Sequence, residues 1–300
     1  MMKMVAVDFD QIAEAVAAGA ALTVPQLRAL ACTRDLIGLG MLAADVRARR
    51  HGSRGTFVRV EHLDVGTWPG ELAADIPADA GEVRLTGTPA SLSAAVAAVR
   101  AARAATTAPV SGWSLDDLSR WGAPLGETLA ALREAGLEAV ATARLDRLDD
   151  AQMQAAALAG LPVQTVTLGT PVDDETLIEQ LQRLRAWQAA TAVVRACAPL
   201  PVETSAEQPT TGYDDMRHVA VARLVLDNVD HIQAHWTRMG AKLSQACLLF
   251  GANDVDAVPA RDDMPHGPRR AILEEVRRNL VAASLQAVER DGRFRVRSDP

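Results

Sequence analysis

The stretch that decides the fold is PVQTVTLGTP, residues 162–171, because it has the pattern of a buried β-strand followed by a tight turn. Strand alternation places Val163, Thr165 and Thr167 on one face and Val166 and Leu168 on the other. Acidic residues 173–175 then open a helix that carries leucines at 177, 181 and 184. The sequence therefore predicts a strand–turn–helix unit here.

The same unit recurs along the chain in both directions. Strands are expected at residues 56–63, 82–86, 108–113, 138–143, 193–198 and 231–236, and the last of these is expected to be the final strand. Helices are expected at 33–50, with Thr33 as the cap, and from 91, 125, 211 and 241 onward. Strands separated by helix-length segments indicate βαβ units and a parallel sheet.

A single (β/α) barrel, complete or partial, is the predicted α/β fold. A doubly wound open sheet is the alternative, but G-x-G-x-x-G follows none of the expected strands. Residues 1–50 are expected to form a helical extension, residues 51–255 the barrel, and residues 256–300 a C-terminal helix and tail packed on it as part of one domain. The tail 291–300 and the segment 255–270 are the candidates for disorder.

Composition narrows the class of protein. Hydrophobic residues make up 49% and charged residues 23%, as in a globular chain with a sizeable core. The net charge of −7 without a basic stripe argues against nucleic-acid binding. Neither a membrane-spanning apolar stretch nor a signal-like N-terminus is expected, which favours a cytoplasmic location. Cys32, Cys197 and Cys247 are far apart in sequence, so reduced, mostly buried thiols are expected.

The strand at 231–236 holds the most promising polar residues. His231, Gln233 and His235 share one face, and polar groups near the C-terminal ends of barrel strands line the active site in this fold. One interpretation places Gln233 and His235 in a ligand pocket, supported by Arg223 and Asn228, with His235 as the acid–base candidate. The other leaves His231 in solvent and has Gln233 and His235 close an internal hydrogen-bond network.

A metal site is not expected from the histidines. His231 and His235 have H-x-x-x-H spacing, which would suit a metal pair on a helix, but the segment is expected to be a strand and no third ligand is evident. The other histidines are scattered and expected to be solvated; they are His51, His62, His218 and His266.

Several segments resemble one known family. They are RRHGSR (49–54), ALREAGL (131–137), APLP (198–201), PTTGYDDMR (209–217), AVARL (220–224), LDN (226–228), HIQAHW (231–236), GAK (240–242), FGAND (250–254) and VERD (288–291). They are similar to the radical S-adenosylmethionine group of aminofutalosine synthase, dehypoxanthine futalosine cyclase and the deazaflavin-forming FO synthase. The resemblance covers most of the chain from Leu36 and is firmest after Gly160. It implies a radical-enzyme-type TIM barrel and a link to the futalosine pathway of menaquinone biosynthesis.

The chain departs from this family where the cofactors bind. The family carries C-x-x-x-C-x-x-C after its first strand, whereas residues 60–70 here read VEHLDVGTWPG. The glycine-rich turn that holds the methionine end of S-adenosylmethionine survives only as residues 86–89, with Gly87 as the candidate cofactor contact. The family's glycine-rich segment after the fourth strand is replaced by residues 139–145. Thiolates hold iron–sulfur clusters, so neither a 4Fe–4S cluster nor S-adenosylmethionine is expected.

The expected function is therefore that of a cluster-free homologue, a pseudoenzyme with respect to radical chemistry. It is expected to bind a futalosine-like nucleoside, to associate with an active paralogue, or to form a homo-oligomer. The first alternative is an enzyme that performs acid–base chemistry in the inherited pocket. The second is a radical enzyme that borrows other ligands. Whether the segment 65–76 leaves the barrel mouth open or plugged stays open at this point.

Overall fold

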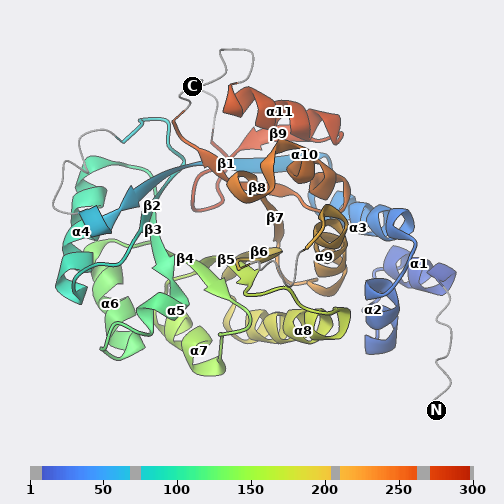
Figure 1. Ribbon diagram of the computed structural model, residues 1–300, viewed down its shortest axis with the longest axis horizontal. Helices are drawn as coiled ribbons and strands as arrows, with labels where there is room; N and C mark the ends of the chain where they lie inside the picture. Colours follow the sequence, from blue (N-terminus) through green and yellow to red (C-terminus); the bar gives the residue numbers. More distant parts are fainter. Residues whose placement is uncertain (1–8, 68–75, 204–209, 262–270, 298–300) are drawn as a thin grey trace.

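A closed barrel of parallel strands surrounded by helices forms the computed structural model, which describes residues 9–67, 76–203, 210–261 and 271–297 (Figure 1). Within this described part, the order of the strands in the sheet is β2-β3-β4-β5-β6-β7-β8-β1-β9, and β1 also pairs with β2, which closes the barrel. The predicted (β/α) barrel is confirmed and is complete rather than partial, and the open-sheet alternative is wrong.

The strands agree closely with those expected from alternation. They are β1 (Arg54–Asp64), β2 (Glu82–Thr86), β3 (Val110–Ser114), β4 (Ala139–Arg144), β5 (Val163–Leu168), β6 (Val194–Pro201), β7 (His231–His235), β8 (Asp254–Pro259) and β9 (Gln286–Glu289). The prediction that residues 231–236 form the last strand is wrong, because β8 and β9 follow. Strand β8 also crosses the expected domain boundary at residue 255, so the barrel continues to residue 259.

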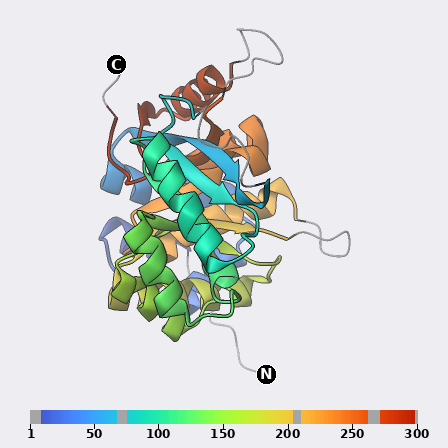
Figure 2. The ribbon, with the colours of Figure 1, turned by 90° about the vertical axis from the view of Figure 1, so that its left-hand side faces the viewer.

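Helices form the outer ring. They are α1 (Phe9–Ala17), α2 (Val24–Ala31), α3 (Leu36–His51), α4 (Leu92–Ala105), α5 (Leu115–Leu118), α6 (Leu125–Ala135), α7 (Asp150–Ala159), α8 (Asp174–Thr191), α9 (Gly212–Val225), α10 (Trp236–Leu249) and α11 (Ile272–Ala282). Helices α4 and α6 pack side by side on one flank (Figure 2). A short 3-10 helix, η1 (Val65–Thr67), follows β1; the remainder of the segment that was a candidate plug, residues 68–75, lies outside the described residues.

Local sequence explains where the helices begin. Asp173 caps α8 and Thr211 caps α9 through side-chain oxygens that accept backbone N–H groups. The cap of α3 is Asp35, not the predicted Thr33: the Asp35 carboxylate accepts the Gly38 N–H at 2.8 Å. Thr33 instead accepts the N–H of Asp35, at 3.2 Å, so it supports the cap rather than forming it.

The core lies between the strands and the helix ring. Leu177, Leu181 and Leu184 of α8 are fully buried, as their spacing predicts. Burial of each such leucine stabilises the fold by roughly 1.5–3 kcal/mol. Val166 and Leu168 of β5 belong to the same hydrophobic core. These contacts fix the positions of the strand ends that carry the polar residues described below.

The C-terminal segment closes the N-terminal end of the barrel. Strand β9 pairs with Arg54–Phe57 of β1, while β2 pairs with Val60–Asp64, so both lie in tandem along one edge of β1. The chain then passes beneath the strands: the Gly292 N–H donates to the Gly81 carbonyl at 2.9 Å, and Arg293 forms an ion pair with Glu138. The expectation of a disordered tail is wrong for residues 291–297.

Candidate functional site

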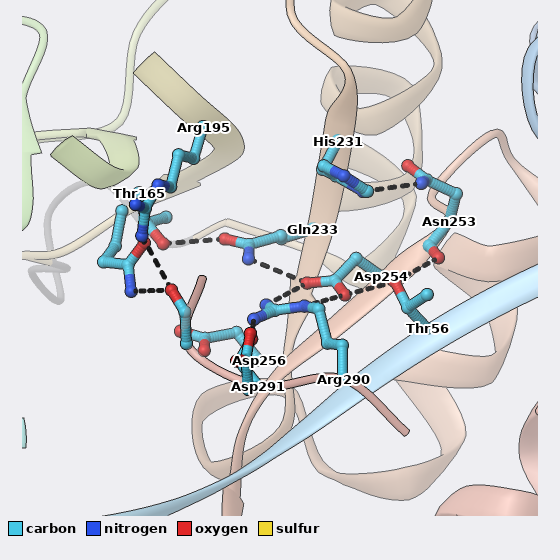
Figure 3. Close-up of polar contacts among 12 residues, drawn as sticks. Thr56, Thr165, Arg195, His231, Gln233, Asn253, Asp254, Asp256, Arg290 and Asp291 are labelled. Carbon is cyan, nitrogen blue, oxygen red and sulfur yellow. Dashed lines mark hydrogen bonds and ion pairs between the residues drawn. The ribbon is translucent and has the colours of Figure 1, made fainter. Parts of the chain in front are cut away.

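The interior of the barrel holds a buried polar network centred on Asp254 of β8 (Figure 3). The Gln233 amide donates to Asp254 Oδ2 at 2.8 Å and accepts the Thr165 hydroxyl at 2.7 Å. Arg290 donates from Nε and Nη2 to the two oxygens of Asp254, each at 2.6 Å. Gln233 is therefore engaged on both sides by protein groups, as the internal-network interpretation predicts.

A second buried ion pair lies nearer the C-terminal ends of the strands. Arg84 of β2 donates to both oxygens of Asp256 at 3.0 Å and to Glu82 at 3.0 Å. Burial opposes ionisation of Asp256, but the Arg84 guanidinium outweighs it and holds the pKa of this carboxyl well below its usual range. Ala257, the next residue, has a φ of +57°, at an irregularity in the pairing of β8 with β1. A non-glycine residue in this region marks a locally strained backbone beside the ion pair.

A cavity of about 480 Å³ opens at the C-terminal end of the barrel. Its walls come from the ends of β3 to β8 and consist of polar side chains with one hydrocarbon side chain, Val202. The lining residues are Ser114, Asp116, Asp117, Arg120, Thr142, Arg144, Arg147, Thr165, Thr167, Val202, Glu203, His235, Arg238 and Asp256. In (β/α) barrels this end carries the ligand site, so the cavity is the candidate functional site.

Arg144 shapes one wall of this cavity. Its guanidinium donates to Asp146 at 3.1 and 2.8 Å and also contacts Glu203. A hydrogen bond to Asp146 is the main cause that raises the pKa of Arg144. A Cβ on Gly169 would lie 1.9 Å from the Asp146 carboxylate, so only glycine fits there. Residues 139–145 thus bring a fixed cation to the barrel mouth.

Asp116 is the residue that sequence reasoning missed. Its side chain is 5% exposed, and within the described residues neither carboxylate oxygen accepts a hydrogen bond. Burial raises the pKa of Asp116, while Arg147 and Arg144 act in the opposite direction. Its place in the sequence, two residues after the end of β3, was the available signal, because such positions line the mouth of a barrel.

His235 lies in the cavity wall, as one interpretation predicted. Its ring is half-buried and Nδ1 lies 3.2 Å from the Thr237 hydroxyl. Burial lowers the pKa of His235, so the ring is neutral at pH 7 and can exchange a proton with a ligand. Asp256 lines the same cavity and interacts electrostatically with this ring.

The structure does not bring Arg223 and Asn228 to His235, which corrects the expected four-residue site. Arg223 of α9 is 1% exposed and donates to the Gly251 carbonyl at 2.9 Å and to Asn253 Oδ1 at 2.5 Å. It borders a separate cavity of about 450 Å³ lined by residues of α1, α2, α3, α8 and α9. The Asn228 side chain donates to the Arg185 carbonyl at 2.8 Å, outside the barrel. Both residues hold the fold together at these positions.

The remaining histidines are only partly as expected. His62 is exposed, but His218 is 4% exposed, which contradicts a solvated position. His231 is half-buried: its ring lies 4.6 Å from that of Phe294 and 5.7 Å from that of the half-buried His51, measured between centroids. His266 lies outside the described residues. Among the described residues, no three His, Cys, Asp or Glu side chains gather in an arrangement that could hold a metal ion.

The cysteines do not fit an iron–sulfur cluster. Cys32 is exposed next to the end of α2, whereas Cys197 in β6 and Cys247 in α10 are fully buried. Burial raises the pKa of Cys197 to about 12 and raises that of Cys247 as well, so both stay protonated thiols. Cluster ligands are thiolates, and these three come from separate elements. These three thiols therefore do not form a set of donors for such a cluster.

Gly87, the candidate cofactor contact, lies in the turn after β2 and has a φ of +77°. A Cβ at this position would lie 2.0 Å from Asp64 Oδ1. Its carbonyl accepts the Trp113 indole N–H at 3.0 Å. The contacts with Asp64 and Trp113 account for glycine here by packing alone, and a role in cofactor binding stays a prediction.

Part of the chain that lines the cavity matches a known protein-family model. Residues 201–266 match the family model described as the CofH/MqnC C-terminal region. This region runs from the end of β6 through β8, and it supplies Val202, Glu203, His235, Arg238 and Asp256 to the cavity.

The wider chain is homologous to curated enzymes. It is 31% identical over 204 residues to aminodeoxyfutalosine synthase of Thermus thermophilus, an alignment that covers 57% of this chain and 55% of that enzyme. It is 30% identical over 105 residues to cyclic dehypoxanthine futalosine synthase of Streptomyces coelicolor, covering 33% and 26%. It is 53% identical over 45 residues to 5-amino-6-(D-ribitylamino)uracil–L-tyrosine 4-hydroxyphenyl transferase of Methanoculleus marisnigri, covering 15% and 12%. The aligned part spans about half the length of the first of these relatives and less of the others.

Solved structures support the fold beyond the CofH/MqnC C-terminal region. Methylornithine synthase superposes with a TM-score of 0.69 at 17% identity, covering 92% of this chain and 97% of that one. The hydrogenase maturase HydG of Carboxydothermus hydrogenoformans gives a TM-score of 0.62 at 11% identity, covering 93% and 79%. The chain thus has the (β/α) barrel fold of these two proteins. No helix in the described ranges is both long and apolar enough to span a membrane.

Proposed function

We propose that this protein is a cluster-free, non-radical relative of the futalosine-pathway enzymes that binds a nucleoside-like ligand in the cavity at the barrel mouth. The proposal includes a role as a binding subunit that associates with an active paralogue. Homology to the futalosine enzymes suggests the class of ligand. One observation carries the proposal: the cavity is lined by ordered polar side chains, while the three thiols are dispersed and two are buried and protonated.

The character of the cavity supports a neutral, hydroxylated ligand. Guanidinium groups and carboxylates both line it, and most are already paired, as the lining Arg144 is with Asp146 and the lining Asp256 is with Arg84. The threonine hydroxyls at 142, 165 and 167 add neutral hydrogen-bonding groups. A small ligand with hydroxyl and amide groups matches such a surface better than an apolar molecule does.

Calorimetric titration of the full chain with futalosine tests ligand binding. Thr142→Trp should abolish binding, because the indole would fill space in the cavity. Leu158→Trp is the matched control, since Leu158 is 90% exposed on the outer helix α7 and its replacement should leave binding unchanged. Absence of heat with the wild-type chain, or equal binding by Thr142→Trp, would contradict the proposed site.

Two further measurements test the cluster-free and partner parts. Anaerobically purified and reconstituted protein should contain no stoichiometric iron or sulfide and should not cleave S-adenosylmethionine. Size-exclusion chromatography of a mixture with a catalytic relative should show a common peak if the chain is a partner subunit. Stoichiometric iron and sulfide together with cofactor cleavage would overturn the cluster-free assignment.

A second candidate function is acid–base catalysis on a futalosine-like nucleoside, with His235 as the proton-transfer group. The observation that favours it is the position of His235 in the cavity wall as a neutral imidazole. It predicts turnover without reductant or S-adenosylmethionine that falls at least ~100-fold in His235→Ala. Thr237→Val, which removes the hydroxyl near Nδ1, should shift the pH profile while retaining turnover. Undiminished turnover in His235→Ala would exclude the role.

A further inference from the structure

Asp116 combines three properties that are rarely found together. It lines the candidate cavity, the residue is only 5% exposed, and both its carboxylate oxygens lack donors within the described residues. Leaving a buried carboxylate without hydrogen bonds is unfavourable, because nothing offsets its loss of hydration. Most buried polar groups in folded proteins are paired, so an unpaired one in a cavity points to a missing partner.

The neighbouring polar groups are hydrogen-bonded, so only the Asp116 carboxylate lacks a partner in this segment. Asp117 accepts the Ser114 hydroxyl at 2.6 Å and the Arg120 guanidinium at 2.8 Å. Arg120 also donates to the backbone carbonyl of Asp116 at 3.2 Å, so the backbone of this residue is held while its carboxylate is not. The short helix α5 thus fixes Asp116 in place at the edge of the cavity.

The charges around the cavity restrict what the partner can be. Two carboxylate oxygens accept two neighbouring donors at once, which suits a guanidinium, an amidine or a vicinal diol. Four arginines line the same cavity, at 120, 144, 147 and 238, and they disfavour a cationic ligand. A neutral pair of hydroxyl donors satisfies the carboxylate without meeting this repulsion.

We infer that Asp116 anchors the ribose of the ligand by accepting hydrogen bonds from its 2′- and 3′-hydroxyl groups. The inference rests on the proposed nucleoside-binding function and adds which part of the nucleoside lies at the β3–β4 wall. The threonine hydroxyls of β4 and β5 and the Val202 side chain also line the cavity and then face the remainder of the ligand. Discrimination between ribonucleosides and 2′-deoxyribonucleosides follows from this contact, because the deoxy compound leaves one buried oxygen unpaired.

Titrations with adenosine and 2′-deoxyadenosine test the inference. The wild-type chain should bind adenosine ~10-fold or more tightly than 2′-deoxyadenosine, because the deoxy compound lacks one hydrogen bond to a charged group. Asp116→Asn should lose most of this preference. Glu134→Gln on the exposed outer face of α6 makes the same change in charge and should leave the preference intact.

The stability of the ligand-free protein gives a second readout. Asp116→Asn should raise the melting temperature by a few degrees, because it removes a buried unpaired charge. If the Asp116 carboxylate instead stabilised the fold through protein contacts, Asp116→Asn would lower the melting temperature.

The outcomes separate this inference from the proposed function. Equal affinity of the wild-type chain for both nucleosides, or retained preference in Asp116→Asn, overturns the diol anchor and leaves nucleoside binding standing. Failure of adenosine, 2′-deoxyadenosine and futalosine alike to bind the wild-type chain overturns both. A melting temperature that falls in Asp116→Asn also overturns the anchor, because it would mean that the carboxylate is already satisfied by protein groups.

Discussion

Arg290 and Asp254 form a two-point ion pair in the barrel interior, with the Nε–Oδ1 and Nη2–Oδ2 contacts both at 2.6 Å. Arg290 is 1% exposed and Asp254 is fully buried. Burial opposes ionisation of Asp254, but Arg290 more than compensates and lowers the pKa of this carboxyl. The pair ties the segment after β9 to β8, so the closure of the barrel base depends on a charge supplied from beyond the last strand.

Replacing Arg290 should therefore destabilise the protein strongly. Arg290→Met leaves Asp254 as a buried carboxylate without its cation, which costs about 3–5 kcal/mol. Urea unfolding should show this loss, whereas Arg295→Met, at an exposed position of the same segment, should stay within about 0.5 kcal/mol of wild type. The double change Arg290→Met with Asp254→Asn should recover part of the loss. No recovery would indicate that packing, rather than charge, carries the effect.

Two glycines with similar backbone angles should respond differently to alanine. Gly87 and Gly122 have φ values of +77° and +80°, so adding a Cβ at either position destabilises the fold by about 1–2 kcal/mol. At Gly122 no atom lies within 4 Å of the added Cβ, but at Gly87 the Asp64 carboxylate lies 2.0 Å away and would have to leave its hydrogen bond to the Gly66 N–H. In thermal unfolding, Gly87→Ala should have a lower melting temperature than Gly122→Ala. Equal melting temperatures would mean that the Asp64 carboxylate moves away from the added Cβ without a measurable loss of stability.

His231 should make the protein less stable in mild acid. Burial lowers the pKa of His231 to about 4, against about 6.5 in the unfolded chain. Between these values the unfolded state binds more protons, so the contribution of His231 to stability is lost as the pH falls from 7 toward 4. The Asp215 carboxyl, with a pKa raised by burial to about 6, acts with the opposite sign. Comparison with His231→Asn isolates the histidine, because Asp215 is present in both proteins.

The expected result is a stability curve that is flatter with pH for His231→Asn than for wild type, measured as the free energy of unfolding in urea from pH 7.5 to pH 4.5. Asparagine retains a group that can bond to the Asn253 side chain, which lies 2.9 Å from His231 Nδ1. Parallel curves for the two proteins would show that His231 titrates alike in the folded and unfolded states.

Thiol labelling should distinguish the three cysteines. Cys32 is exposed, while Cys197 and Cys247 are fully buried with raised pKa values. Iodoacetamide should therefore modify one thiol in the native protein and three in urea, counted by intact-mass spectrometry. Cys32→Ser is the control that should reduce native labelling to zero. Rapid native labelling of all three would contradict the buried positions of Cys197 and Cys247.

Sequence patterns predicted much of the barrel because alternation and capping are local properties. The strand at 162–168 and the leucine face of α8 lie where the pattern put them. The C-terminal end was harder to predict: β9 is short and only partly buried, and residues 290–297 carry charges that resemble a solvated tail. Those charges are matched by distant partners such as Glu138, 155 positions away in the sequence, which no local pattern reveals.

In the candidate site, too, sequence patterns predicted some features and missed others. Strand periodicity placed His235 on the polar face of β7, and the structure puts it in the cavity wall. The family resemblance suggested that Arg223 and Asn228 would join it. Instead, Arg223 of α9 donates to the Gly251 carbonyl, and Asn228, in the loop after α9, donates to the Arg185 carbonyl. Asp116 escaped notice because an unpaired carboxylate can be recognised only when every neighbouring donor has a known position.

By itself, the sequence determined the βαβ periodicity, the dispersal of the three cysteines and the resemblance to futalosine-pathway enzymes, because each of these is written in the order and spacing of residues. Only the tertiary structure decided that Gln233 hydrogen-bonds within an internal network and that Arg290 pairs with Asp254 at the base of the barrel. It also decided that the Asp116 carboxylate has no hydrogen-bond partner among the described residues. The physical reason is that pairing and burial are properties of groups brought together in space. Closure of the barrel brings such groups together from opposite ends of the chain.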